Sequence, residues 1–168
     1  MQARLTACVL ALCAAAPAAA QEDSCRSFSW SVGRSINLFD EPVPVVRDHQ
    51  SLPKEGVFGL LLKPVGDVVY PVAPERASDG GTGAVITIEN IPAGRYQIAL
   101  SEDVWIDAIQ ENQRLPVLAY EVGGFCPGVR RSLQIEARGE PLTLLIGGTA
   151  VQRVNIAVVR IWPFEWRW

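Results

Sequence analysis

The second half of the chain is a series of short segments in which apolar and polar residues alternate, with turn residues between the segments. In 95–101, for example, Tyr96, Ile98 and Leu100 share one parity, as a strand with one buried face requires. Such closely spaced segments are typical of antiparallel sandwiches and not of alternating strands and helices. They cover 84–90, 95–101, 104–109, 115–122, 129–137, 142–146 and 151–161. We therefore predict an all-β fold, an antiparallel, jelly-roll-like β-sandwich of about eight or nine strands.

The first half of the chain is less regular. In 27–32 three apolar residues alternate with serines and predict a first strand. The segment 33–53 carries three prolines and is predicted to be an irregular loop with one extended piece at 45–46. A further strand is predicted at 56–63 and a short extended segment at 68–70. Because no segment has a convincing helical period, no helix is predicted.

The N-terminus has the composition of a bacterial Sec-type signal peptide. Arg4 precedes a short apolar run, and three alanines at 18–20 are small residues that signal peptidase accepts. No run in the chain approaches the roughly 18 apolar residues of a transmembrane helix, so no transmembrane segment is expected. We predict a signal peptide over 1–20, cleaved after Ala20, a single β-sandwich domain over 21–161 and an aromatic C-terminal tail over 162–168. The protein is accordingly expected in the periplasm or secreted.

Two cysteines remain after the signal peptide is removed, Cys25 and Cys126. An exported chain meets an oxidising environment, so one disulfide between them is the simplest expectation. This disulfide would tie the N-terminal segment to the loop before Val129. A redox-active pair is the alternative, but the two residues do not form a Cys-x-x-Cys motif.

The charge of the chain limits the class of partner. Without Arg4 the mature chain has 14 basic and 18 acidic side chains. Nucleic acids and anionic membrane surfaces attract proteins with a basic field, which this composition does not supply. We therefore expect no nucleic acid partner.

Catalytic chemistry is limited by the single histidine, His49. One histidine excludes sites that need two, including the iron site of two histidines and one carboxylate and the common zinc sites. A Ser-His-Asp triad would have to use His49 with Asp48 in a proline-rich loop, and no nucleophile-elbow motif is present. We expect a non-catalytic protein with no cofactor and no metal, in which His49 is a solvated loop residue.

Two residues of one predicted strand are candidates for ligand binding. Val104, Ile106 and Ala108 form its apolar parity, so Trp105 and Asp107 point away from the core. An indole beside a carboxylate on a sheet face offers stacking and hydrogen bonds to a saccharide. The alternative is that another strand or the N-terminal segment covers Trp105.

Two arginines, Arg130 and Arg131, follow the second cysteine. Arg131 shares the parity of Leu133 and Ile135, which places it at the mouth of the core, where a guanidinium needs an acceptor such as Asp107 or a loop carbonyl. A structural pair with a carboxylate is one interpretation, and a bound anion or polar ligand is the other. The ligand-binding candidates are thus Trp105, Asp107, Arg130 and Arg131.

The C-terminal tail carries aromatic residues at alternate positions, namely Trp162, Phe164, Trp166 and Trp168. One interpretation is an aromatic edge that packs back on the sandwich. The other is an exposed surface that contacts a protein partner or the cell envelope.

Three stretches of the chain stand out together: Ala93-Gly94-Arg95-Tyr96, Val104-Trp105-Ile106-Asp107 and Cys126-Pro127-Gly128-Val129-Arg130-Arg131. With them the chain resembles a family of small exported bacterial proteins that are often labelled homogentisate 1,2-dioxygenase. The resemblance extends over about 56–159 and implies an exported β-sandwich. The dioxygenase label does not fit this chain, because one histidine cannot supply the iron ligands. The strand-and-turn layout is also loosely similar to bacterial pre-peptidase C-terminal domains.

These observations favour a non-catalytic exported binding or accessory module that contacts a protein partner or a saccharide. A structural component of the cell envelope without a small ligand is the second hypothesis. An enzyme of unknown class is the least favoured.

Overall fold

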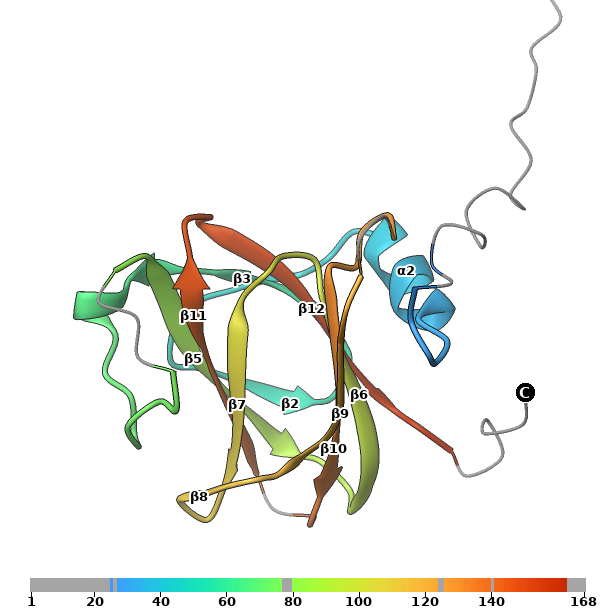
Figure 1. Ribbon diagram of the computed structural model, residues 1–168. Coiled ribbons are helices and arrows are strands. Elements are labelled where there is room, and N and C mark those ends of the chain that lie inside the picture. The colour runs from blue at the N-terminus through green and yellow to red at the C-terminus, as the bar shows by residue number, and fades with distance from the viewer. Residues whose placement is uncertain (1–24, 26, 77–79, 124–125, 140, 163–168) are drawn as a thin grey trace, which may run out of the picture.

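The computed structural model describes residues 25, 27–76, 80–123, 126–139 and 141–162 and contains two mixed β-sheets packed as a sandwich (Figure 1). The described elements are α2 (Gly33–Asp40), β1 (Val45–Val46), β2 (Gln50–Lys54), β3 (Val57–Leu61), β4 (Lys63–Pro64), a 3₁₀ turn η1 (Val65–Asp67), β5 (Thr82–Asn90), β6 (Gly94–Leu100), β7 (Trp105–Gln110), β8 (Gln113–Arg114), β9 (Val117–Val122), β10 (Arg131–Ala137), β11 (Leu142–Thr149) and β12 (Arg153–Arg160). The predicted β-sandwich is therefore confirmed.

Each sheet has six strands. Sheet A has the order β1-β3-β12-β6-β10-β9, so β9 is one of its edges. Sheet B has the order β2-β5-β11-β7-β8, and β4 also pairs with β5. Most neighbours are antiparallel, but β1 runs parallel to β3 and β2 runs parallel to β5. The chain passes from sheet B to sheet A between β8 and β9, at one flank of the sandwich.

The core lies between the sheets and is built by the residues that alternate along the strands. Each strand places every second side chain inside, and these side chains are hydrophobic, with the hydroxyl of Tyr96 donating to the carbonyl of Pro92. Burying each large aliphatic side chain contributes about 1.5–3 kcal/mol relative to leaving it in water. Fully buried members include Leu60, Ile86, Ile98, Leu100, Leu133, Ile135, Leu142 and Ile156. The apolar positions of the alternation predicted within 84–161 thus form most of this core.

The outer face of sheet A is covered by the N-terminal segment and α2. Phe28 and Val32 are buried there against Ala99 of β6 and Ala157 of β12. The two alanines leave room for this second layer, in which the indole Nε1 of Trp30 donates a hydrogen bond of 2.9 Å to Ser132 Oγ. This face of the sheet is therefore a second, smaller hydrophobic core.

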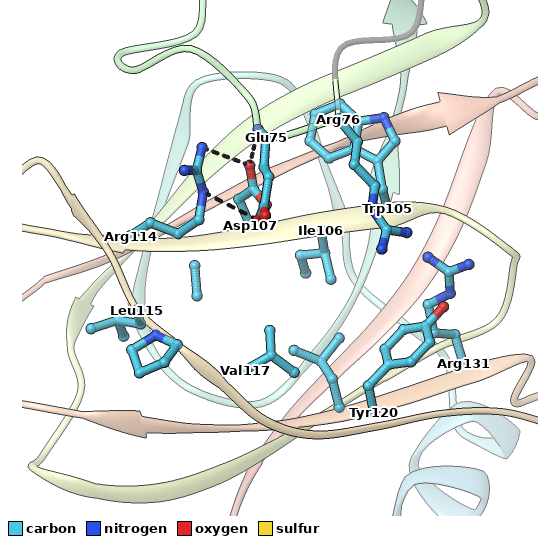
Figure 2. Close-up of a pocket in the computed structure, with 13 residues that line it drawn as sticks. Glu75, Arg76, Trp105, Ile106, Asp107, Arg114, Leu115, Val117, Tyr120 and Arg131 are labelled. Atoms are coloured by element: carbon cyan, nitrogen blue, oxygen red, sulfur yellow. Dashed lines mark hydrogen bonds and ion pairs between the residues drawn. The ribbon is translucent and has the colours of Figure 1, made fainter.

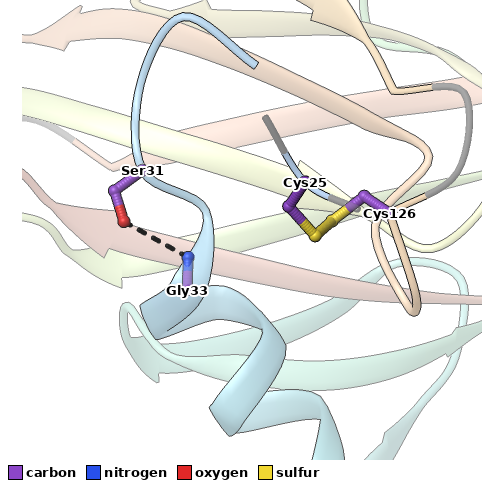
Figure 3. The surroundings of a disulfide bond; sticks show 4 residues. All are labelled: Cys25, Ser31, Gly33 and Cys126. Atoms are coloured by element: carbon purple, nitrogen blue, oxygen red, sulfur yellow. Dashed lines mark hydrogen bonds between the residues drawn. A yellow bond between two sulfur atoms is a disulfide. The ribbon is translucent and has the colours of Figure 1, made fainter. Parts of the chain in front are cut away.

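A disulfide between Cys25 and Cys126 closes this layer (Figure 3). The two cysteines are 101 positions apart in the sequence, and Cys126 is buried in the small outer core. The bond fastens the beginning of the described chain to the loop before β10, as predicted. A disulfide is typical of proteins in an oxidising compartment.

Several predictions for the first half of the chain are wrong. The segment 27–32 forms turns and bends, because its alternating apolar residues lie against the outside of sheet A without pairing as a strand. The predicted loop 33–53 contains α2, whose partly buried Ile36 and Phe39 follow Val32 at helical spacing. The same region also forms β1, as predicted, and β2. β1 pairs in parallel with β3, and β2 pairs in parallel with β5.

The number of strands is also larger than predicted. The described residues form twelve strands in place of the expected eight or nine. Two-residue strands such as β4 and β8 are too short to show an alternating pattern in the sequence. In the short extended segment predicted at 68–70, Val68 has extended backbone, but the segment belongs to no strand and lies across the outer face of sheet B.

In the described ranges, no helix is long and apolar enough to span a membrane. The predicted signal peptide, 1–20, lies outside the described residues.

Candidate functional site

A cavity of about 590 Å³ opens at the flank of the sandwich where the chain leaves sheet B for sheet A (Figure 2). It exists because β8 is too short to extend sheet B. β8 pairs with Ile109 and Gln110, and the N–H of Leu115 donates to the carbonyl of Ala108, so residues 105–107 of β7 form an open edge opposite β9 and β10. The lining residues are Glu75, Arg76, Trp105, Ile106, Asp107, Ala108, Arg114, Leu115, Pro116, Val117, Tyr120, Arg131 and Leu133.

One end of the cavity is a network around Asp107. The Asp107 carboxylate, only 7% exposed, lies 3.2 Å from Nη2 of Arg114 and accepts a hydrogen bond of 2.8 Å from the backbone N–H of Glu75. Arg114 also lies 3.9 Å from the Glu75 carboxylate and donates to the carbonyl of Ala73. One guanidinium therefore faces two carboxylates, and the network fastens the 73–75 segment to β7 and β8.

The other end of the cavity is cationic. The buried guanidinium of Arg131 donates to the carbonyl of Val104 and pairs with the carboxylate of Asp103. Its Cζ lies 5.0 Å from the centre of the Tyr120 ring, a cation–π arrangement. Arg76 is exposed, and the described residues supply no ion pair or hydrogen bond to its side chain. Two arginines thus face this end, with the exposed Asp103 as the carboxylate nearby.

Trp105 lies on the outer face of sheet B, on the opposite parity to the core, as predicted. Its indole is only 8% exposed, however, because Tyr70 covers it with ring centres 5.9 Å apart. On its other side lie Gly147 and Gly148, where an added Cβ at Gly147 would come within 2.6 Å of the indole. The structure favours the covered alternative, but the covering segment is the one after η1 and not a strand or the N-terminus. An open indole face for stacking a sugar ring is not available.

The cavity brings together three of the four ligand-binding candidates. Trp105, Asp107 and Arg131 all line it, whereas Arg130 is exposed in the loop before β10 and does not. Arg131 sits at the mouth of the core with a loop carbonyl as acceptor, as predicted, but Asp107 pairs with Arg114 instead.

Four charged or polar lining residues were not identified from the sequence: Glu75, Arg76, Arg114 and Tyr120. Glu75 and Arg76 reach the cavity only because their loop is fastened to Asp107. Arg114 faces Asp107 because the turn at Glu111 and Asn112 folds β8 back on β7. The polar turn at 111–113 was the available signal, since a tight hairpin fixes which residues lie side by side.

The edge strand β9 is unusually apolar on its exposed side. Charged or bulged edges hinder pairing of a sheet with another chain, and β9 has one bulge, at the register shift between Gln134 and Ile135 of β10. Glu121 is the charged residue of β9, and its carboxylate accepts from the backbone N–H of Ser29. The exposed apolar residues are Val117, Leu118, Tyr120 and Val122.

The candidate tail is described only at its first residue. Trp162 is 52% exposed, and the guanidinium of Arg160 lies 4.8 Å from its ring centre. Phe164, Trp166 and Trp168 lie outside the described residues.

His49 lies away from the cavity, on the loop before β2. It is exposed, with Nε2 3.7 Å from the Asp48 carboxylate. Asp48 is occupied structurally, since it accepts from the backbone N–H of Val85 at 2.7 Å and pairs with Lys63 at 2.6 Å. Within the described ranges, no three His, Cys, Asp or Glu side chains are grouped as metal ligands would be.

Comparison of the chain with family models, with curated proteins and with solved structures gives no match. The family resemblance stays a prediction, and function is therefore argued from the site.

Proposed function

We propose that this chain is an exported, non-catalytic binding or accessory module whose partner enters the cavity between β7 and β9. The observation that carries the proposal is that Trp105, Asp107 and Arg131 line one cavity. Its volume of about 590 Å³ lies within the range of small-molecule sites. Apolar walls with a few fixed polar groups are typical of such sites.

The charged groups of the cavity support binding rather than catalysis. Asp107 is already engaged by Arg114 and by a backbone N–H, and Arg131 by Asp103 and a carbonyl. These contacts hold both groups in place, so that they can orient a ligand, whereas a general acid or base needs a group free to exchange a proton with the substrate.

Export belongs to the proposal as well. The Cys25–Cys126 disulfide is typical of an oxidising compartment, and the composition of 1–20 is typical of a signal peptide. We place the mature protein in the periplasm or outside the cell.

A protein partner is the second candidate, and the exposed apolar row of β9 favours it. An unpaired edge strand with apolar side chains can accept an added strand from another chain. A structural envelope component without a small ligand is the alternative to both.

The test compares two neighbouring substitutions on β9 by calorimetric titration of the mature protein. Val117→Phe fills the cavity mouth, whereas Leu118→Phe makes the same kind of change at a residue that does not line the cavity. The probes are neutral oligosaccharides, acidic oligosaccharides and short extended peptides.

We expect one probe class to bind with a single stoichiometric site, about tenfold or more weakly in Val117→Phe and unchanged in Leu118→Phe. Equal binding by both variants would place the site elsewhere and contradict the proposal. No binding of any class would favour the structural component.

A further inference from the structure

We infer that the ligand of the flank cavity is a small amphiphilic anion: a compact anionic group, such as a carboxylate or phosphate, on an apolar body. Arg76 and Arg131 receive the anionic group. The inference rests on the proposed function and names the ligand class of the same site.

The first argument is the uneven distribution of charge along the cavity. At one end, Arg114 is balanced by two carboxylates, Asp107 and Glu75, at 3.2 and 3.9 Å. At the other end are the guanidinium groups of Arg76 and Arg131, with the carboxylate of Asp103 paired to Arg131, so two cations there face one described carboxylate. An anion is therefore attracted to the Arg76–Arg131 end and repelled from the Asp107 end, which sets the direction in which a ligand enters.

The second argument is the state of the two arginines. Arg131 is 9% exposed and fixed by three contacts, with Val104, Asp103 and the Tyr120 ring. Its Nε–H has no acceptor among the described residues. Arg76 is exposed and has no carboxylate partner in the described part of the chain. A fixed guanidinium beside one that has no carboxylate partner among the described residues suits an anion that accepts several N–H groups, because the planar fork matches a carboxylate or phosphate.

The third argument is the surface between the two ends. The lining there is aliphatic: Ile106, Ala108, Leu115, Val117 and Leu133. Such a wall binds an apolar body and offers it no hydrogen bonds. A cationic end joined to an aliphatic wall therefore selects an amphiphile over a free inorganic anion or a polar sugar.

The cationic end is also not a general property of the surface. The whole chain has a net charge of −3, so a small anion is not drawn to the protein by its overall charge. Binding of an anion would have to depend on the local arginines.

The experiment uses two fluorescent probes with the same apolar body, anilinonaphthalene sulfonate and the uncharged phenylnaphthylamine that lacks the sulfonate. The oxidised mature protein is titrated with each. Arg76→Gln removes a charge at the cavity, and Arg34→Gln on the exposed side of α2 is the control for loss of a charge elsewhere. Val117→Phe blocks the cavity, and circular dichroism confirms that each variant is folded.

We expect one sulfonate site that Val117→Phe removes, and at least tenfold weaker binding of the uncharged probe. Arg76→Gln should weaken sulfonate binding about tenfold and leave the uncharged probe unchanged, while Arg34→Gln has no effect on either. Added salt should weaken binding of the sulfonate alone.

Two results would overturn the inference, and they are distinguishable. If both probes bind equally and Arg76→Gln changes neither, the cavity is a binding site without anion preference, and the proposed function stands. If Val117→Phe changes neither probe, or the folded protein binds neither, the cavity is not a binding site and both proposals fail.

Discussion

Asp107 shows how one carboxylate can organise the wall of a cavity. Its sequence position indicated a side chain directed away from the core, and that parity is confirmed. The carboxylate is nevertheless buried, because the 73–75 segment folds over it and supplies an N–H from Glu75. The neighbouring Arg114 completes its pairing. A buried N–H group is costly to leave without an acceptor, so removing the Asp107 carboxylate should loosen the 73–75 segment.

We predict that Asp107→Ala lowers the free energy of unfolding by about 2–3 kcal/mol, because it leaves the Glu75 N–H without its acceptor and removes the buried carboxylate that pairs with Arg114. Urea unfolding followed by fluorescence measures the change. Glu136→Ala is the control, since the Glu136 carboxylate is 57% exposed and lies 3.7 Å from Arg95. It should cost no more than about 0.5 kcal/mol. Equal small losses in both variants would contradict the assigned role of Asp107.

A second residue-scale prediction concerns Tyr70, which covers Trp105. Burial, and then the nearby charge of Asp48, raise the pKa of the Tyr70 phenol above its usual value of 10.0. The unfolded chain therefore releases this proton first, and stability falls as the pH rises through about 10 towards the folded pKa. Tyr70→Phe lacks this proton and should lose stability less steeply in that window. At neutral pH it loses the hydrogen bond to the Ile146 carbonyl, about 1 kcal/mol.

The measurement is the urea midpoint of wild type and Tyr70→Phe at a series of pH values from about 8 to 11. The difference between the two proteins should narrow as the pH rises. A constant difference would show that the Tyr70 phenol does not contribute to the alkaline loss of stability.

Among the elements, the strands with period-two sequence were predictable and the others were not. β5, β6, β7 and β10 alternate because each has one face in the core, and their positions follow from the sequence. α2 is only eight residues long, so its apolar stripe is too short to be recognised as a helical period in the sequence. The parallel pairs of β1 and β2 depend on distant partners, which no local pattern encodes.

At the element scale we predict that the disulfide is the main constraint on the N-terminal layer. The double substitution Cys25→Ala with Cys126→Ala should lower the free energy of unfolding by about 4–5 kcal/mol, because it releases a loop closed over 101 positions. Urea unfolding of the variant and of the reduced wild-type protein should agree. A loss below about 1 kcal/mol would mean that hydrophobic packing of Phe28 and Val32 alone holds this layer.

On the scale of the molecule, the cavity follows from the topology rather than from a motif. The sequence indicated Trp105 and Asp107 by their parity, and it indicated Arg131 by its parity and its position shortly after Cys126. That they share one cavity depends on two facts of the topology: β9 is an edge of sheet A, and β8 covers only the end of β7 in sheet B. The facing of two sheets is a long-range property of the fold, so Arg76 and Tyr120 could not be added from the sequence.

The most direct test of the binding site is a titration of isotope-labelled mature protein with anilinonaphthalene sulfonate, followed by NMR. The account predicts that the indole N–H of Trp105, the Nε–H of Arg131 and the backbone N–H of Val117 shift together with one dissociation constant. The indole N–H of Trp30, bonded to Ser132 on the outer face of sheet A, should stay in place. Shifts confined to Trp30 and its surroundings, with the cavity signals unmoved, would contradict the account.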